Sequence, residues 1–216
     1  RYDPIADFAP ISLVAWSSYV LVVPASSPSR SVAELFAAAA ATPGRLTYAT
    51  PGVGTVHHVA TELILQKANV TMLHVPYKTS GAAVADVLAG RIDAELLPLS
   101  VVLPHVQSGR FVALATGSPK RLPQLPQVPT LAESNLDVGN LDLWYGFLAP
   151  KGTAAARIDR LNHEIAKIAA EPGFAAALEA QGIVPATSTP AGFGRLLVEE
   201  HARWTAVVER AGITGE

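Results

Sequence analysis

The segment Leu46–Ile64, "LTYATPGVGTVHHVATELI", joins a short β-like run to an amphipathic helical pattern through a glycine-rich turn. Gly52 and Gly54 remove the Cβ atoms that would keep a ligand away from the backbone, and the following helix presents its N-terminal N–H groups at the same place. Thr55 can add a hydroxyl group. On spacing alone, the turn is either a cradle for a small anion or a plain connection between a strand and a helix.

Strand and helix patterns alternate on both sides of this turn, which predicts an α/β fold. Between residues 20 and 120, helical runs end at glycines such as Gly90 and Gly109, and β-rich runs follow directly. Repeated strand–helix units imply a mainly parallel sheet flanked by helices. Residues 119–140 are a proline-rich connector in which Thr130 and Glu133 are expected to cap a short helix. Residues 141–216 are mostly helical and supply too few strands to form a sheet of their own. We therefore expect them to pack against another part of the protein.

The composition excludes several classes of function. The chain has 216 residues, of which 50% are hydrophobic and 16% are charged, and its formal net charge is −2. It has no dense Lys/Arg stripe, which argues against binding to nucleic acid or to anionic membrane surfaces. No segment approaches the ~18 consecutive apolar residues of a spanning helix, so we expect no direct membrane insertion. The sequence has no cysteine, which excludes disulfides, thiolate zinc sites and cysteine nucleophiles.

The glycine turn fits a carboxylate better than a phosphate. A phosphate loop requires Lys-Ser/Thr after the glycines, and a dinucleotide fingerprint requires a third glycine where this chain has His57. A second helix N-terminus follows "HVPYK", at Thr79–Gly81. Two such termini at one sheet edge would form a paired anion site, although Ser80 as a simple N-cap also explains this segment.

Nothing in the sequence indicates catalysis, a metal or a cofactor. There is no G-x-S-x-G nucleophile elbow, and no H-E-x-x-H motif relates the histidines to a metal site. Trp144 and Tyr145 are adjacent on a predicted strand, which would turn one side chain to the core and the other to a cleft, although core packing explains both. We therefore predict a binding protein and not an enzyme.

Six stretches, in order along the chain, resemble the substrate-binding receptors of tripartite tricarboxylate transporters, the Bug or TctC family. They are "YDPIADFAPISLVA", "PGRLTYATPGVGTVHHVATELI", "HVPYKTSGAAVADVLAGRID", "LPHVQSGRFVALATGSPKRLPQLPQVPTLAES", "WYGFLAPKGT" and "WTAVVERAGI". The resemblance implies a periplasmic type II binding protein with two α/β lobes that have mainly parallel sheets. It places the end of lobe one and the hinge entry at residues 1–20, lobe two at 21–130, and the return to lobe one at 131–216. Lobe one is expected to be incomplete, because the family's first strand and "PFPAGG"-like loop are not among the matching stretches.

The family pattern Gly-x-Gly-Ser/Thr-x-x-His matches the opening turn, and the family's Tyr-Lys-Gly-Ser stretch matches "YKTS". Leu97 stands where family members usually carry an aspartate that contributes to the cleft, which suggests a more apolar ligand or altered recognition. Thr79 stands where a glycine is usual. The predicted ligand-binding residues are Gly52, Val53, Gly54, Thr55, His58, Thr79, Ser80, Leu97 and Tyr145.

The predicted function is that of an extracytoplasmic receptor that binds a small carboxylate and passes it to the membrane permease subunits of a tripartite transporter. A periplasmic location follows from the resemblance. The alternatives are a truncated or degenerate paralogue with a structural or sensory role, and an α/β enzyme that binds a nucleotide or a phosphorylated ligand. We expect Thr55→Val to weaken binding with little loss of stability.

Overall fold

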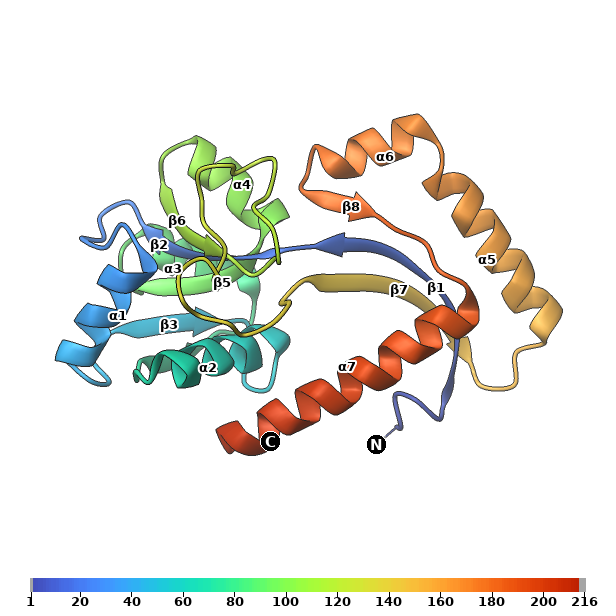
Figure 1. The fold of residues 1–216 in the computed structure, drawn as a ribbon, viewed down its shortest axis with the longest axis horizontal. Helices are drawn as coiled ribbons and strands as arrows, with labels where there is room; N and C mark the ends of the chain where they lie inside the picture. The colour runs from blue at the N-terminus through green and yellow to red at the C-terminus, as the bar shows by residue number, and fades with distance from the viewer. Residues whose placement is uncertain (1, 214–216) are drawn as a thin grey trace. The chain divides into compact units, whose positions relative to one another are not determined.

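The computed structural model describes residues 2–213, which form two compact units (Figure 1). The first unit comprises the residues up to Ser17 together with Leu143–Ala206. The second comprises Ser18–Asp142 and the residues from Val207 onward. The lobes expected from the resemblance follow the same order along the chain, and their bounds stay a prediction.

The second unit is built on a five-stranded sheet. Its strands are β2 (Tyr19–Pro24), β3 (Thr47–Thr50), β4 (Leu73–Pro76), β5 (Ala94–Pro98) and β6 (Phe111–Thr116), in the order β4-β3-β5-β2-β6. β3 is parallel to β4 and β5, whereas β2 is antiparallel to β5 and β6. Four strands therefore run in one direction and β2 alone is reversed, because helical crossovers link the four while β2 begins directly after Ser18. The expectation of a mainly parallel sheet holds for this unit.

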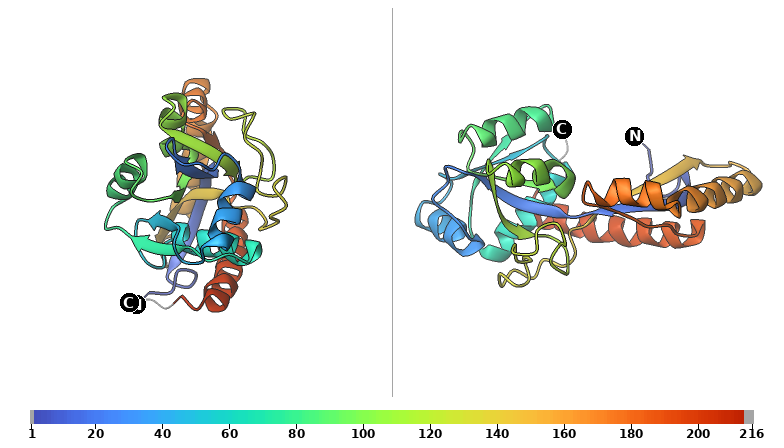
Figure 2. Two further views of the ribbon diagram at one scale, coloured as in Figure 1. Left: turned by 90° about the vertical axis from the view of Figure 1, so that its left-hand side faces the viewer. Right: turned by 90° about the horizontal axis from the view of Figure 1, so that it is seen from above.

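Helices lie on both faces of this sheet (Figures 1 and 2). They are α1 (Val32–Ala41), α2 (Val56–Ala68), α3 (Ser80–Leu88) and α4 (Leu99–Gln107). On one face, Val22 and Leu97 from the strands are buried in one cluster with Val87 from α3. On the other face, the ring of Tyr48 in β3 stacks with that of His58 in α2. Both faces of the sheet are therefore covered, as in other α/β sheets.

Hydroxyl side chains start three of these helices. α1, α2 and α3 each begin at a residue whose hydroxyl oxygen accepts the N–H group three residues later. The capping box expected in the connector also forms, with Thr130 N–H donating to Glu133 at 2.8 Å and Glu133 N–H donating to Thr130 at 3.1 Å. The short helix predicted there is wrong, because the segment forms only turns. Asn135 has a φ of 63°, and Leu136 N–H bonds back to Leu131 O, which stops the helix after one turn.

The first unit contains an antiparallel sheet, in contrast to the mainly parallel sheet expected for lobe one. Its strands β1 (Phe8–Ser17), β7 (Leu143–Pro150) and β8 (Ile183–Pro185) lie in the order β7-β1-β8, and its helices are α5 (Ala155–Ala169), α6 (Pro172–Glu179) and α7 (Pro190–Ala211). β1 and β7 are antiparallel because the chain leaves this unit along β1 and returns along β7. Phe193 of α7 packs on Gly146, and Ile158 of α5 packs on Ala149. These two β7 residues face opposite sides, so α7 and α5 pack on different faces of the sheet.

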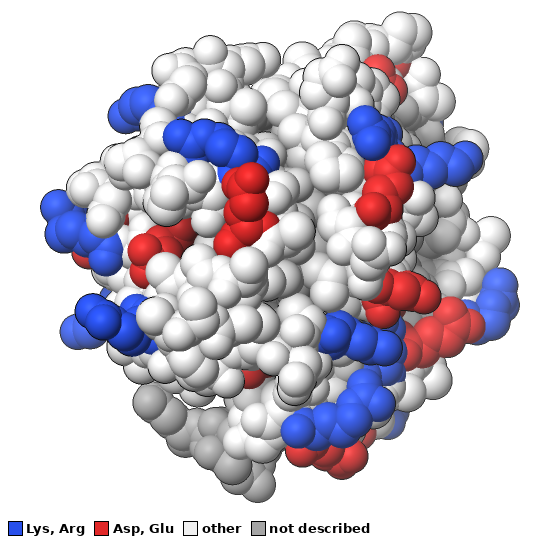
Figure 3. All heavy atoms as spheres, turned by 60° about the vertical axis from the view of Figure 1, so that its left-hand side comes forward, with Lys and Arg blue, Asp and Glu red and all other residues white. Residues whose placement is uncertain are grey.

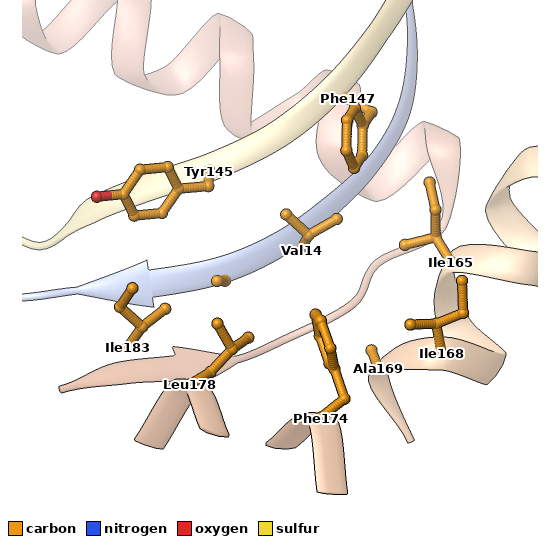
Figure 4. A pocket seen from close by; sticks show the side chains of 10 residues that line it. Val14, Tyr145, Phe147, Ile165, Ile168, Ala169, Phe174, Leu178 and Ile183 are labelled. Carbon is orange, nitrogen blue, oxygen red and sulfur yellow. The ribbon is translucent and has the colours of Figure 1, made fainter. Parts of the chain in front are cut away.

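The β7 face that carries Tyr145 and Phe147 is only partly covered. Tyr145 is 38% exposed and Phe147 is 55% exposed. Side chains from β1, β7, α5, α6 and β8 surround a hollow of about 480 Å³ on this face, which we call the first-unit groove (Figure 4). Its apolar lining includes Val14, Tyr145, Phe147, Ile165, Phe174 and Ile183. The first unit therefore presents a continuous apolar surface.

Charged side chains of both signs lie on the face shown in Figure 3, where acidic and basic groups are interspersed. Asp86 pairs with Arg91, and Glu133 pairs with Arg121 at 2.9 Å. Among residues 2–213, no helix combines the length and the apolarity needed to cross a membrane.

Candidate functional site

The glycine turn connects the end of β3 at Thr50 to the start of α2. Gly52 has a φ of +141° and Gly54 a φ of +72°, and residues with side chains rarely adopt such values. A Cβ atom at Gly54 would meet no atom within 4 Å, so the backbone conformation and not crowding requires glycine there. The shape of the turn therefore depends on the two glycines that the sequence singled out.

Thr55 is the N-cap of α2, and its hydroxyl group also closes the turn. The oxygen accepts the N–H of His58 at 3.5 Å, and the hydroxyl donates to the Gly52 carbonyl at 2.8 Å. This geometry contradicts the expectation that Thr55→Val leaves stability nearly unchanged, because valine would remove both hydrogen bonds. Contact between Thr55 and a ligand stays a prediction.

His58 lies behind the turn, with only 8% of its surface exposed. Its Nδ1 accepts the N–H of Gly54 at 3.1 Å. This nitrogen therefore faces the turn as an acceptor and cannot donate to an anion. Burial lowers the pKa of His58, and the nearby Glu62 carboxylate partly opposes that shift.

A pocket of about 530 Å³ opens beside the turn. Two of its lining residues, Tyr77 and Lys78, were missed by the sequence reasoning, although "YK" directly precedes the second predicted helix start. Lys78 is exposed and brings a positive charge to the pocket. Desolvation and a 2.7 Å hydrogen bond to Asp86 raise the pKa of Tyr77 to about 12, so its phenol stays neutral. The lining consists of Pro51, Gly52, Val53, Thr55, Pro76, Tyr77 and Lys78.

Unpaired backbone donors border this pocket. Within residues 2–213, the N–H groups of Val53 and Thr55 have no hydrogen-bond partner, whereas the N–H of Gly54 is taken by His58. The dipole of α2 favours a negative charge here by ~0.3–1 kcal/mol. Two amides, a helix N-terminus and the Lys78 ammonium group together form a site with the chemistry of carboxylate binding.

The second helix N-terminus lies at the same sheet edge. Its N-cap is Thr79, whose hydroxyl oxygen accepts the N–H of Ala82 at 3.3 Å, so the alternative in which Ser80 is the cap is wrong. α2 and α3 follow the carboxyl ends of β3 and β4, which are adjacent parallel strands. Thr79 and Ser80 are both exposed, and their contact with a ligand stays a prediction.

Two of the predicted site residues lie away from this pocket. Leu97 is fully buried in the core beneath α3, next to Val20 of the adjacent strand, so its side chain does not line the pocket as expected. Tyr145 belongs to the first unit, where it lines the first-unit groove. Its neighbour Trp144 packs edge-on against Phe193, with the ring centroids 5.5 Å apart. The alternation predicted for the Trp-Tyr pair is therefore present.

Two histidines of the second unit, His58 and His74, form a ring stack. The rings of His58 and His74 are nearly parallel, with centroids 4.0 Å apart, and the Tyr48 ring lies 4.9 Å from His74. In the described part of the chain, no group of three or more His, Asp or Glu residues is placed to hold a metal ion.

Comparison with known families gives one match over nearly the whole chain. The description "Tripartite tricarboxylate transporter family receptor", TctC, matches residues 1–213. The chain belongs to this family. The recognition drawn from the six stretches is thereby confirmed, and TctC is a family of receptors and not of enzymes.

Two curated relatives of this TctC-family chain are longer than the chain itself. The UPF0065 protein in the tcbD-tcbE intergenic region of Pseudomonas sp. strain P51 is 40% identical over 208 residues, which are 96% of this chain and 62% of that protein. BugT of Bordetella pertussis is 33% identical over 211 residues, which are 98% of this chain and 65% of BugT. The chain thus spans slightly less than two thirds of either relative.

Solved structures confirm the fold. The structure of R. palustris Rpa4515 with adipate matches with a TM-score of 0.92 and 31% identity, over 99% of this chain and 71% of that one. The periplasmic binding protein BugD matches with a TM-score of 0.90 and 25% identity, over 100% of this chain and 73% of BugD. The periplasmic-binding-protein fold expected from the resemblance is therefore present.

Proposed function

We propose that this chain supplies a carboxylate site to a periplasmic solute receptor, which passes its solute to the membrane permease of a tripartite tricarboxylate-type transporter. The observation that carries the proposal is the start of α2. There the unpaired N–H groups of Val53 and Thr55 border one pocket with Lys78. Charge-assisted hydrogen bonds of this kind are the strong contacts in carboxylate recognition.

The solute class that the site supports best is a small dicarboxylate. One carboxylate would accept the two amides beside Lys78, and the hydroxyl groups of Thr79 and Ser80 at the start of α3 are the neighbouring donors. Support comes from the relative Rpa4515, which is 31% identical and was solved with adipate. Leu97 has no contact role in this proposal, because it is part of the core.

Binding is tested by titrating the purified chain with adipate, using calorimetry and thermal unfolding. The control ligand is 1,6-hexanediol, which has the same carbon skeleton without the carboxylates. We expect adipate to raise the unfolding midpoint by mass action, with ~2.7 kcal/mol of added stability at a concentration 100 times its Kd, and hexanediol to have no effect. If neither adipate nor the shorter succinate shifts the midpoint at millimolar concentration, the chain does not bind dicarboxylates and the proposal fails.

The positive charge beside the pocket is tested with Lys78→Gln. We expect adipate affinity to fall about fivefold to tenfold, because one charged contact of a partly exposed site is lost. Lys120→Gln is the matched control, since Lys120 is an exposed lysine of the same unit and does not line the pocket. Equal affinities of the two variants would remove Lys78 from the site.

A further inference from the structure

Two stacked imidazoles support the glycine turn from behind. His58 lies in the first turns of α2, and His74 lies in β4, directly opposite Tyr48 in the register of β3 and β4. The two imidazole planes are 12° from parallel, with ring centroids 4.0 Å apart. Neither ring lines the pocket. Any influence of these histidines on a ligand must therefore pass through the turn.

Each imidazole is linked to a different glycine of the turn, one directly and the other through a threonine hydroxyl. His58 Nδ1 accepts the Gly54 N–H directly, at 3.1 Å. His74 Nε2 lies 2.6 Å from the hydroxyl oxygen of Thr50, which is fully buried. That hydroxyl group contacts both sides of Gly52, because it donates to the carbonyl at 3.1 Å and its oxygen accepts the N–H at 3.3 Å. His74 thus acts on Gly52 through Thr50.

The bond to Gly54 requires a neutral His58 ring. The bond to Thr50 does not depend on the charge of His74, because the Thr50 hydroxyl donates its one proton to Gly52 and His74 Nε2 is then the donor to Thr50. An imidazole nitrogen that accepts a hydrogen bond has no proton, so the proton of His58 is on Nε2. A second proton, on Nδ1, would turn this nitrogen into a donor that faces the Gly54 N–H donor, so the hydrogen bond between them would be lost. Protonation of both rings would also place two positive charges about 4 Å apart, where Coulomb repulsion is strong in a partly buried site.

Burial favours the neutral form of both rings, although one nearby group, the Glu62 carboxylate, opposes this at His58. Glu62 is the nearby carboxylate on α2, and the Tyr48 hydroxyl of β3 donates to it. His57, on the same helix, packs edge-on against Tyr19 of β2. Burial lowers the pKa of His58, and burial together with the neighbouring His58 lowers the pKa of His74 to about 4.

We propose that His58 and His74 are positioning residues that hold the glycine turn in its binding shape, and that the bond to Gly54 lasts only while the His58 ring is neutral. Acidification then releases Gly54, so carboxylate affinity falls as the pH falls, even though the added positive charge by itself would favour an anion. The expected fall in carboxylate affinity rests on the proposed function. The expected change in the conformation of the turn does not, because it can be measured without a ligand.

The turn is tested by NMR on the ¹⁵N-labelled chain. With His74→Phe, which keeps a flat ring in the stack but loses the bond to Thr50, we expect the Gly52 amide to exchange about fivefold to tenfold faster at constant pH. His105→Phe, in α4 of the same unit, is the control and should leave that rate within about twofold. In the wild-type chain, the Gly54 amide shift should titrate together with the ring signals of His58 between about pH 7.5 and pH 4.5. This titration needs no variant, so it decides the matter even if His74→Phe fails to fold.

The ligand measurement separates the two proposals. Adipate affinity should fall from about pH 7.5 to pH 5.5 in the wild-type chain and in His105→Phe, and it should already be weak at pH 7.5 in His74→Phe. If the Gly52 and Gly54 amides respond as expected and adipate does not bind, positioning stands and the carboxylate proposal fails. The positioning role is overturned if adipate binds, the Gly52 amide exchange rate is unchanged in His74→Phe, and the Gly54 amide shift does not follow the titration of His58.

Discussion

The two units of the chain differ in how they cover apolar side chains. In the second unit, Val22 and Leu97 have no exposed surface, because helices pack on both faces of a five-stranded sheet. In the first unit, Phe147 is 55% exposed and Phe174 is 41% exposed. Its sheet has three strands, and α5 covers only part of the face of β7 that carries Phe147. The difference shows that two units of one chain can bury their apolar side chains to very different extents.

This difference explains why the candidate site lies where it does. The glycine turn follows directly from Tyr48, Ala49 and Thr50, whose exposed fractions are 1%, 0% and 0%. A loop that starts from a fully buried strand keeps its donors in place before a ligand arrives, which reduces the entropy cost of binding. The first unit offers apolar area in the first-unit groove instead of oriented polar groups.

The largest expected effect comes from matched leucine substitutions in the two units. Leu97→Ala should lower the free energy of unfolding by about 2–5 kcal/mol, because it removes buried methyl groups and leaves a cavity. Leu161→Ala, on α5 of the first unit, should cost less than ~1 kcal/mol, since that side chain is 46% exposed. Chemical denaturation of both variants checks the difference. Similar losses would show that the two units do not differ in core packing.

A smaller effect on the free energy of unfolding is expected from replacing Glu95, which carries a fully buried carboxyl group in β5. Within residues 2–213 neither of its oxygens has a hydrogen-bond partner, and burial raises its pKa to about 8 from an ordinary value of 4.5. Between these two values the folded chain binds the proton and the unfolded chain does not. Stability is therefore fully present below about pH 4.5 and declines as the pH rises towards 8.

Glu95→Gln should flatten this decline, because the amide has no proton to lose in this range. We expect the variant to gain roughly 1–3 kcal/mol relative to wild type between pH 5 and pH 8. Unfolding curves at several pH values measure it, and Glu164→Gln, on the exposed surface of α5, is the control. If the free energy of unfolding of Glu95→Gln declines with pH as steeply as that of the wild type, another group causes the pH dependence.

The smallest effects are expected at the helix starts. Thr79→Ala should destabilise the second unit by about 0.5–2 kcal/mol through loss of the α3 cap. In the first unit, α5 begins after Ala154 without a side-chain cap, so Ala154→Ser should stabilise it by roughly 0.5–1 kcal/mol. Thermal unfolding measures both variants. A lower midpoint for Thr79→Ala and a higher midpoint for Ala154→Ser would support the contrast between the units. A lower midpoint for both would show that the start of α5 cannot use a hydroxyl cap.

Much of the candidate site was predictable because its signals are local. The glycines of the turn, the hydroxyl caps and the start of α2 each depend on residues within about four positions of one another. Leu97 was misplaced because the resemblance gives its position along the strand but not what covers the face to which its side chain points. Tyr77 and Lys78 were missed because only the pairing of β3 with β4 brings them beside the turn.

The sequence by itself determined the family, the strand–turn–helix unit at 46–64 and the glycines that this unit requires, since these follow from local backbone sterics and short motifs. Only the tertiary structure decided that β2 runs against its neighbours, that the sheet of the first unit is antiparallel, and that His58 and His74 stack behind the turn. The physical reason is that strand direction, register and ring contacts between distant residues depend on packing across the sheet. No pattern within one segment encodes them.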